Sequence, residues 1–365
     1  MTPPLLFVSG EYPPDVGGVG DYTHRLRHAL ASQGWRSTVL SRRQVRHWDA
    51  RALVWLLRTA PRYGLVHIQF QAGAYDLLGD VCLMPTLLRR LRPRVRVVTT
   101  FHDTRVPYLF ARAGRLRRAA VNLLAASSDA VIAADERDLE SLGSSPTRQH
   151  QVPIGANIDR APGAGYDRAV FRTRLGLTHA SLAIVYFGLL NHSKGLDLLL
   201  DAFDRILRDT PNARLLLLGG EIGASDPTDR LTANRLHARL DALGARVVRT
   251  GWLQPEALSR YLLAGDVALL AYADGASPRR GSLLACAEHG LPIVSTQPAS
   301  RAVADAVYAV APDSAGLAAA VLEIVRTPST AAQLRQSAAG LAAQTTWPQI
   351  AAAHLKIYEQ LHTST

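Results

Sequence analysis

The sequence predicts an α/β protein made of two units, each with a parallel, doubly wound sheet. Three observations support this fold class. The chain has 365 residues, which exceeds the size at which a single hydrophobic core usually stops growing. Short apolar segments alternate with segments of helical periodicity, and no hairpin turns join them. The alternation weakens near residues 151–180, where we expect an interdomain crossing and linker, and then begins again.

The first unit is expected to cover residues 1–160. We predict its strands at 5–9, 37–40, 65–70, 95–101 and 130–134, and its helices at 21–32, 50–59, 77–91 and 117–127. A loop with Gly17, Gly18 and Gly20 follows the first strand, and glycine there lets a ligand approach the backbone closely. A dehydrogenase is disfavoured, because the full Gly-x-Gly-x-x-Gly pattern and an acidic residue ending the second strand are both missing.

The second unit is expected to cover residues 161–345. We predict its strands at 182–188, 213–219, 247–250, 267–272 and 291–296, and its helices at 195–208, 229–243, 255–264, 314–326 and 331–343. A further helix begins near residue 281 and stops at Gly290, the usual residue at a helix C-terminus. The last segment, 346–365, contains an amphipathic helix that we expect to be structural.

The composition places the chain among globular proteins, because 48% of its residues are hydrophobic and 19% are charged. Cys82 and Cys286 lie far apart in apolar segments, so we expect free buried thiols in a reducing compartment. The sequence shows neither a run of about twenty apolar residues nor the pattern of a secretory signal. We therefore expect a cytoplasmic protein.

The net charge of +11 indicates anionic partners. Nearly all the positive charge is arginine, since Lys194 and Lys356 are the only lysines, and genome composition alone could explain part of this bias. Nucleic acid is not expected, because no recognisable binding motif occurs. Arginines at 89–96 and 112–118 accompany the apolar residues 108–110, which favours a peripheral position on an anionic membrane and a lipid-linked acceptor. Solvated helix faces are the alternative.

The segment 274–282 is the most informative one in the chain. Arg279 and Arg280 stand directly before Gly281 and Ser282, where a helix is expected to begin and its first amides lack an internal partner. Paired guanidinium groups at a helix start suit a diphosphate, because each planar fork binds two oxygens at once. The alternative is that both arginines are ordinary solvated residues.

Lys194 is expected beside a second helix start, in the loop from Gly188 to Gly195. With Arg279 and Arg280 it gives three cations from two loops at one edge of a parallel sheet, where ligands usually bind. No Asp-x-Asp and no His/Cys spacing suited to zinc occurs. We therefore expect no metal cofactor, and these side chains would neutralise a leaving diphosphate.

His102 and Asp103 follow the fourth predicted strand, at the mouth of the expected crevice. Loops beyond strand ends carry function more often than strand interiors, so His102 is a candidate for ligand contact. His67 and Gln69 alternate with apolar residues on the third strand and could reach the same side. For His67 we favour a hydrogen-bonded position in the core.

Taken together, these segments resemble the retaining glycosyltransferases of family 4. The resemblance covers nearly the whole chain and is carried by residues 11–20, 101–103, 153–157, 188–195, 251–253, 264–267 and 283–292. It implies two facing Rossmann-like domains in the GT-B arrangement, with the C-terminal helix returning to the first domain. It also implies metal-independent transfer of a sugar, with retention, from a nucleoside-diphosphate sugar to a hydroxyl of a glycan, lipid-linked or small-molecule acceptor.

The resemblance further implies roles for individual residues. Catalysis is expected to involve His102, Lys194 and Arg280. The residues expected to bind the donor are Gly17, Gly18, Gly188, Lys194, Trp252, Leu253, Asp274, Ser277, Arg279, Arg280, Gly281 and Ser282. Tyr22 and Asp103 are expected to contact the acceptor.

Two departures from the family pattern leave the donor sugar open. The family carries an arginine where this chain has Leu189, and glutamates where it has Ser277 and Ala285. We expect the first glutamate's contact with sugar hydroxyls to pass to Asp274 or Ser277, and one of the paired arginines to replace the missing cation. A nucleotide-sugar epimerase of GT-B fold and a non-catalytic nucleotide-sugar-binding relative are the alternatives.

Overall fold

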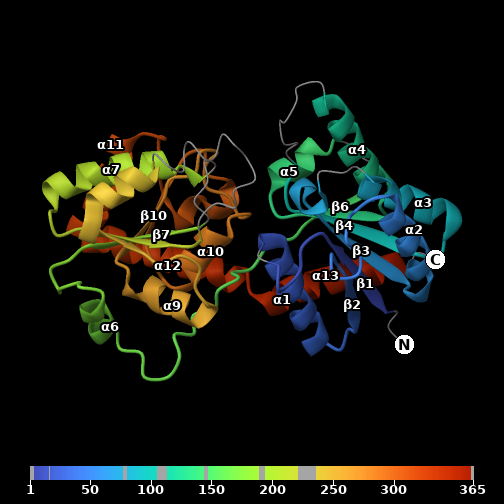
Figure 1. Cartoon of the computed structure of the whole chain (residues 1–365), viewed down its shortest axis with the longest axis horizontal. Helices are drawn as coiled ribbons and strands as arrows, with labels where there is room; N and C mark the ends of the chain where they lie inside the picture. The colour runs from blue at the N-terminus through green and yellow to red at the C-terminus, as the bar shows by residue number, and fades with distance from the viewer. Residues whose placement is uncertain are drawn as a thin grey trace. The chain divides into compact units, whose positions relative to one another are not determined.

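The computed structural model describes residues 4–15, 17–76, 80–104, 113–143, 147–188, 194–220 and 236–362. It divides into two compact units (Figure 1), one formed by residues 1–155 and 345–365 and the other by residues 156–344. The sequence had placed the two boundaries at 160/161 and 345/346. Each unit is built on its own parallel sheet, so the predicted α/β class is confirmed.

The sheet of the first unit has six parallel strands in the order β2-β1-β3-β4-β5-β6. The strands are β1 (Leu5–Ser9), β2 (Ser37–Leu40), β3 (Leu65–Phe70), β4 (Arg96–Phe101), β5 (Ala130–Ala133) and β6 (Arg148–Gln151). The central strands are buried on both faces, which explains their continuous apolar character.

Helices cover both faces of this first sheet. Leu5 and Phe7 of β1 pack with α1 (Gly18–Ser32) and α13 (Trp347–His362), so the C-terminal helix packs on the first unit. Leu6 and Val8 face the opposite layer. That layer contains α2 (Ala50–Thr59), the short helix η3 (Asp80–Leu83), α3 (Met84–Leu91) and α4 (Ala113–Ser127). The remaining short helices are η1 (Ala60–Arg62), η2 (Ala72–Tyr75) and α5 (Glu136–Ser141).

The sheet of the second unit also has six parallel strands, in the order β12-β11-β10-β7-β8-β9. They are β7 (Ala183–Phe187), β8 (Arg214–Leu218), β9 (Val247–Arg249), β10 (Val267–Leu270), β11 (Ile293–Thr296) and β12 (Tyr308–Val310). The helices are α6 (Arg168–Arg174), α7 (Leu196–Asp209), α9 (Pro255–Ala264), α10 (Gly281–Glu288), α11 (Ser314–Arg326) and α12 (Pro328–Gln344), with short helices η5 (Gly244–Arg246) and η6 (Arg301–Ala306). One face of the sheet packs against α7, α11 and α12.

The segment expected to be a linker, 151–180, contains the helix α6, so this expectation is wrong in part. Asp167 caps α6 by accepting a hydrogen bond from the amide of Val170 at 2.8 Å. The helix has only seven residues, three of them arginine, so it shows too little apolar periodicity to be predicted. Part of the helix predicted at 229–243 lies outside the described residues, and residues 236–243 are helical.

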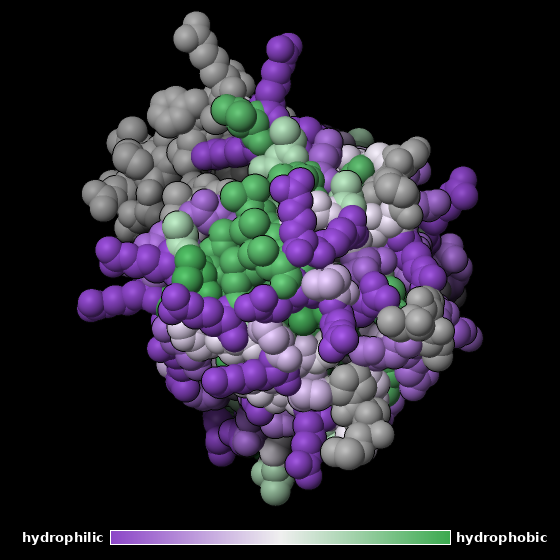
Figure 2. All heavy atoms as spheres, turned by 90° about the vertical axis from the view of Figure 1, so that its right-hand side faces the viewer, coloured by the Kyte–Doolittle hydropathy of each residue, from purple (hydrophilic) through white to green (hydrophobic). Residues whose placement is uncertain are grey.

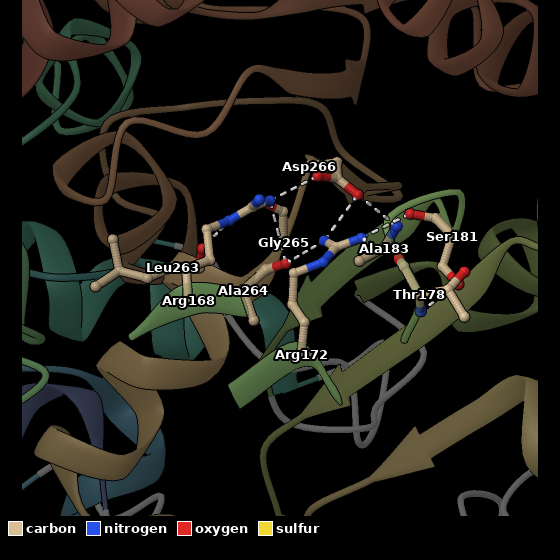
Figure 3. Close-up of polar contacts among 9 residues, drawn as sticks. All are labelled: Arg168, Arg172, Thr178, Ser181, Ala183, Leu263, Ala264, Gly265 and Asp266. Carbon is tan, nitrogen blue, oxygen red and sulfur yellow. Dashed lines mark hydrogen bonds and ion pairs between the residues drawn. The ribbon is translucent and has the colours of Figure 1, made fainter. Parts of the chain in front are cut away.

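The helix α6 is tied to the second sheet through Asp266 (Figure 3). The carboxylate of Asp266 pairs with Arg168 at 2.6 Å and Arg172 at 3.0 Å, and accepts a hydrogen bond from the amide of Ala183 at 2.8 Å. The buried guanidinium of Arg172 also donates to the carbonyl of Ala264 at 2.7 Å. Asp266, part of a segment that carried the family resemblance, thus has a structural role, because its pairing compensates a buried charge.

Candidate functional site

The second sheet places two loops side by side at the carboxyl ends of its strands. The strand order reverses direction between β7 and β10, which are hydrogen-bonded neighbours. Lys194 lies in the loop after β7, and Arg279 and Arg280 lie in the loop after β10. Open parallel sheets bind their ligands at such a switch point, where adjacent loops diverge.

Gly195 fixes the position of the Lys194 loop. Its φ is +64°, and a Cβ added there would lie 1.7 Å from the carbonyl oxygen of Ala271. Only glycine fits both the left-handed backbone and this close approach. The loop therefore lies directly against the segment that leads from β10 to Tyr272.

The ring of Tyr272 brings the predicted cations together. The Nζ of Lys194 lies 5.3 Å from the ring centroid, and the guanidinium carbon of Arg280 lies 4.6 Å from it. Both distances fall in the range of cation–π contacts. The Tyr272 hydroxyl is hydrogen-bonded to the hydroxyl of Ser282 at 2.7 Å, which anchors the ring to the first turn of α10. We call Lys194, Tyr272, Asp274, Arg279 and Arg280 the cation site.

Asp274 pairs with both arginines of the cation site. Its carboxylate forms an ion pair with Arg280 and lies 3.6 Å from the guanidinium of Arg279. Its predicted part in binding sugar hydroxyls stays untested, and in the structure its partners are these cations. Ser277, the other candidate for that part, is 1% exposed, and its hydroxyl accepts a 3.5 Å hydrogen bond from Arg279.

Two donors of the cation site are set up for an anion. The Nε of Arg280 is buried and has no hydrogen-bond partner among the described residues. Burial and the nearby Arg280 lower the pKa of Lys194 to about 8, while Asp274 acts in the opposite direction. A bound anion would offset much of the repulsion between Lys194 and Arg280, because it would pair with both positive charges at once.

The helix α10 starts at the cation site and ends as expected. Arg280 is its N-cap residue, so the amides of Gly281 and Ser282 begin the first turn without intrahelical acceptors. Gly290 follows the helix with a φ of +69°, in line with the predicted stop. The positive end of the helix thus adds to the charge of the three cations.

Glycine loops border the cation site on the side of β8 and β9. A Cβ on Gly219 would lie 2.2 Å from the carbonyl oxygen of Gly188, and the amide of Gly219 donates to Gly251 at 3.3 Å. The loops after β7, β8 and β9 therefore touch one another. Trp252 follows Gly251 and is 58% exposed, and Leu253 is half-buried. An exposed indole can stack on a planar ligand, so the predicted nucleobase contact keeps its physical basis.

The first unit places His102 directly after β4, where the sequence predicted it. Its Nε2 is hydrogen-bonded to Oε1 of Gln69 on β3 at 2.8 Å. Burial, with a smaller contribution from the nearby His354, lowers the pKa of His102 to about 3. His102 is therefore neutral at physiological pH. Since Nε2 donates to the amide oxygen, Nδ1 keeps a free lone pair in this tautomer.

His67 and Tyr22 lie in the core of the first unit. His67 is hydrogen-bonded to Tyr358 at 2.6 Å and to Thr100 at 2.7 Å, which is the core position that we favoured. Tyr22 is 3% exposed, its hydroxyl is 3.3 Å from Nε2 of His354, and its ring packs edge-on against His102 at 4.8 Å. This geometry favours support of His102 over the predicted contact between Tyr22 and the acceptor.

The loop with Gly17 and Gly18 carries a feature that the sequence did not indicate. A Cβ on Gly17 would lie 1.8 Å from a carboxylate oxygen of Glu11, whereas a Cβ on Gly18 would meet nothing within 4 Å. Burial raises the pKa of Glu11 and that of Asp21 in the first turn of α1. Two carboxyl groups at this loop suit sugar or acceptor hydroxyls better than a diphosphate.

Some of the predicted site residues lie outside the described ranges, and some residues of the site were not predicted. Leu189, which stands in place of the family arginine, lies outside the described residues, as do residues 108–110. Asp103 is half-buried after β4 and its acceptor contact stays a prediction. Tyr272, Gln69 and Glu11 were not assigned roles. Only Gln69 had a signal in the sequence, because it alternates with apolar residues on its strand and could therefore reach the side of His102.

No group of three or more His, Cys, Asp or Glu side chains in the described ranges could hold a metal ion. Among the helices that the structure describes, none is long and apolar enough to cross a membrane. Cys82 and Cys286 are free and buried, and burial raises the pKa of each thiol to about 12.

Family models match both units of the chain. The model for "Glycosyltransferase Family 4" matches residues 16–160, and the model for "Glycosyl transferases group 1" matches residues 181–327. The chain belongs to the family 4 glycosyltransferases. These matches include the glycine loop and His102 in the first unit and the cation site in the second.

The chain is also similar in sequence to curated glycosyltransferases. A D-inositol 3-phosphate glycosyltransferase of Segniliparus rotundus is 27% identical over 299 residues, which are 79% of this chain and 58% of that protein. One from Geodermatophilus obscurus is 34% identical over 154 residues, 40% of this chain and 33% of that protein. The matches thus span a third to somewhat over half of these relatives. The structure of Anabaena HepE with UDP and glucose has a TM-score of 0.73 at 18% identity, covering 99% of this chain and 100% of that one, which supports the GT-B fold.

Proposed function

We propose that this protein is a glycosyltransferase that takes a sugar from a nucleoside-diphosphate sugar bound at the cation site. The observation that carries the proposal is the meeting of Lys194 and Arg280 on the ring of Tyr272. The Nε of Arg280, which has no hydrogen-bond partner among the described residues, and the start of α10 add further donors for phosphate oxygens. The Anabaena structure supports the same ligand class, because it contains UDP.

In the proposed reaction, the bond between the anomeric carbon and the diphosphate breaks and a bond to an acceptor oxygen forms. The acceptor proton leaves with the diphosphate or passes to solvent. Lys194, Arg279 and Arg280 stabilise the charge that develops on the diphosphate, which is the usual task of fixed cations at a leaving group. We propose that no metal is required and that departure and attack occur on one face of the sugar, so that the configuration is retained.

His102 has a different part in this proposal. Because its pKa is about 3, the imidazole stays neutral and acts as a hydrogen-bonding group for the transferred sugar. Glu11, beside Gly17, and Asp103, next to His102 in the sequence, are candidates for contacts with sugar or acceptor hydroxyls. The acceptor is proposed to be a glycan, a lipid-linked molecule or a small molecule, and we propose a cytoplasmic location.

The experiment is a thermal-shift screen of nucleotide sugars with the full chain, followed by product analysis with the donor that binds. A bound donor stabilises the folded state by mass action. Sugar transfer with retained configuration in the presence of EDTA supports the proposal. Conversion of the donor without any acceptor would instead identify an epimerase.

A non-catalytic relative is the second candidate, because both glutamates of the family pattern are missing. Ala285 is completely buried and Ser277 nearly so, and neither side chain can replace a carboxylate. This candidate predicts that a nucleotide sugar binds and is neither hydrolysed nor transferred to any acceptor in the screen. Binding without turnover would therefore support the cation site as a nucleotide-sugar site and refute the proposed transferase activity.

A further inference from the structure

The helical layer on one face of the first sheet is rich in arginine. The helices α2, α3 and α4 pack beside one another and against η3. The sequences of α2, α3 and α4 contain no Asp or Glu, and all three carry arginines. The arginines of these helices, with two from the segment after α3, are Arg51, Arg58, Arg89, Arg90, Arg92, Arg94, Arg115, Arg117 and Arg118.

The same layer exposes large apolar side chains. Six of the nine exposed large hydrophobic residues in the described ranges belong to it: Val54, Trp55, Leu83, Leu91, Leu116 and Leu123. Val54 is 47% and Trp55 40% exposed on α2, and Leu83 is 43% exposed on η3. Figure 2 shows an apolar area enclosed by hydrophilic side chains on the side of the first unit where α2 and α3 lie. Contiguous apolar surface of this kind usually marks an interaction site.

We propose that this layer, which we call the basic apolar face, binds the surface of an anionic lipid bilayer. Val54, Trp55 and Leu83 would enter the region between headgroups and acyl chains, where indole side chains are favoured. The arginines around them would pair with lipid phosphates. The proposal concerns a different surface from the cation site and does not depend on the proposed enzyme activity.

Charge complementarity selects this occupant. In a symmetric dimer through this face, the arginines would meet the same arginines of the second copy, with no carboxylate on α2, α3 or α4 to pair with them. Two acidic groups stand at the ends of these elements: Asp49, which caps α2, and Asp80 at the start of η3. Asp49 already accepts hydrogen bonds from the amides of Arg51 and Ala52. An anionic bilayer supplies both the missing negative charge and an apolar interior.

The test is co-sedimentation of the full chain with vesicles. We expect binding to vesicles that contain phosphatidylglycerol, little binding to pure phosphatidylcholine, and weaker binding at raised salt, since exposed charges are screened. Each arginine near an anionic surface contributes about fivefold, so Arg90→Gln with Arg94→Gln should lower the partition coefficient roughly 25-fold. Val54→Ser with Trp55→Ser should lower it as well, at every salt concentration.

Matched controls come from the second unit. Val325 on α11 is 46% exposed, close to Val54, and Arg326 and Arg335 are exposed helical arginines. Val325→Ser and the pair Arg326→Gln with Arg335→Gln should leave vesicle binding unchanged, and melting temperatures check that all variants are folded. The proposal would be overturned if the control variants lost as much vesicle binding as the variants of the basic apolar face. It would also be overturned if the wild type did not bind anionic vesicles. A concentration-dependent dimer that Trp55→Ser abolishes, without vesicle binding, would assign the face to a second copy instead.

Discussion

The cation site in the second unit and the His102 region in the first unit both lie at the carboxyl ends of strands in a parallel sheet. The cation site follows β7 and β10, between which the strand order reverses, whereas His102 follows β4, one strand away from the reversal between β1 and β3. The cation site gathers three positive groups and one carboxylate around Tyr272. The His102 region instead contains a neutral imidazole hydrogen-bonded to an amide. The architecture fixes the place of a site, and the side chains of its loops fix the chemistry.

The two regions also differ in how burial acts on charge. Burial keeps His102 neutral, since removal from water disfavours the charged imidazolium. Burial also lowers the pKa of Lys194, but only to about 8, because Asp274 offsets part of the effect. Lys194 therefore stays mostly charged at neutral pH. This difference fits a division of labour in which one region binds an anion and the other binds hydroxyl groups.

The largest expected effect comes from removing a cation. Arg280→Ala or Lys194→Ala should lower the transfer rate about 100- to 1,000-fold and weaken binding of the nucleoside diphosphate, because a fixed charge at the leaving group is lost. His102→Ala should slow transfer and leave diphosphate affinity unchanged. Transfer assays and calorimetry separate the two. Equal effects of all three variants on diphosphate affinity would show that the regions do not divide the work.

The sequence predicted most of the fold because apolar periodicity and glycine punctuation are local signals. The bounds of α2, α9, α11 and of the first three strands agree with the structure residue by residue. The strand β6 (Arg148–Gln151) was missed because it contains no apolar residue, and α6 because it is short and charged. Both elements are held by partners distant in sequence, which a local pattern does not record.

For the candidate site, the sequence identified the loops but not the contacts within them. It indicated that Lys194 and Arg280 would approach one another, since their loops follow strands of one sheet. It did not indicate that Tyr272 would lie between them or that Asp274 would pair with both arginines. These contacts depend on β7 and β10 being neighbours, and strand order is a tertiary property. The burial of Tyr22 likewise depends on α13, more than 300 residues away in the chain.

A pair of glycine variants compares the loops of the two units. Gly195→Ala should destabilise the fold and abolish diphosphate binding, because its φ is +64° and its Cβ would lie 1.7 Å from a backbone oxygen. Gly18→Ala has free space around its Cβ and should keep the melting temperature within a few degrees. Thermal denaturation and calorimetry test both. If Gly18→Ala folds normally but loses the diphosphate, the first unit contacts the diphosphate after all.

The pH dependence of binding should reflect Lys194 and not His102. Protonated Lys194 attracts the diphosphate, so affinity should be highest below pH 8 and fall as pH rises through about 8 and the ammonium loses its proton. His102 has a pKa near 3 and stays neutral throughout this range. Calorimetry from pH 6 to 9.5 tests this, and Lys194→Arg should remove the decline because arginine keeps its charge. A decline that persists in Lys194→Arg would assign the titration to another group.

The smallest expected effect concerns the residue behind His102. Gln69→Leu removes the 2.8 Å hydrogen bond to the imidazole. Such a bond contributes about 1 kcal/mol net, so its loss should lower the transfer rate roughly fivefold. The ring would then rotate more freely and lose its fixed tautomer, while the cation site would be untouched. Diphosphate affinity should therefore match the wild type, and Gln69→Glu, which can still accept from Nε2, should recover part of the rate. A Gln69→Leu variant with a wild-type rate would show that the imidazole is held by its packing against Tyr22 alone.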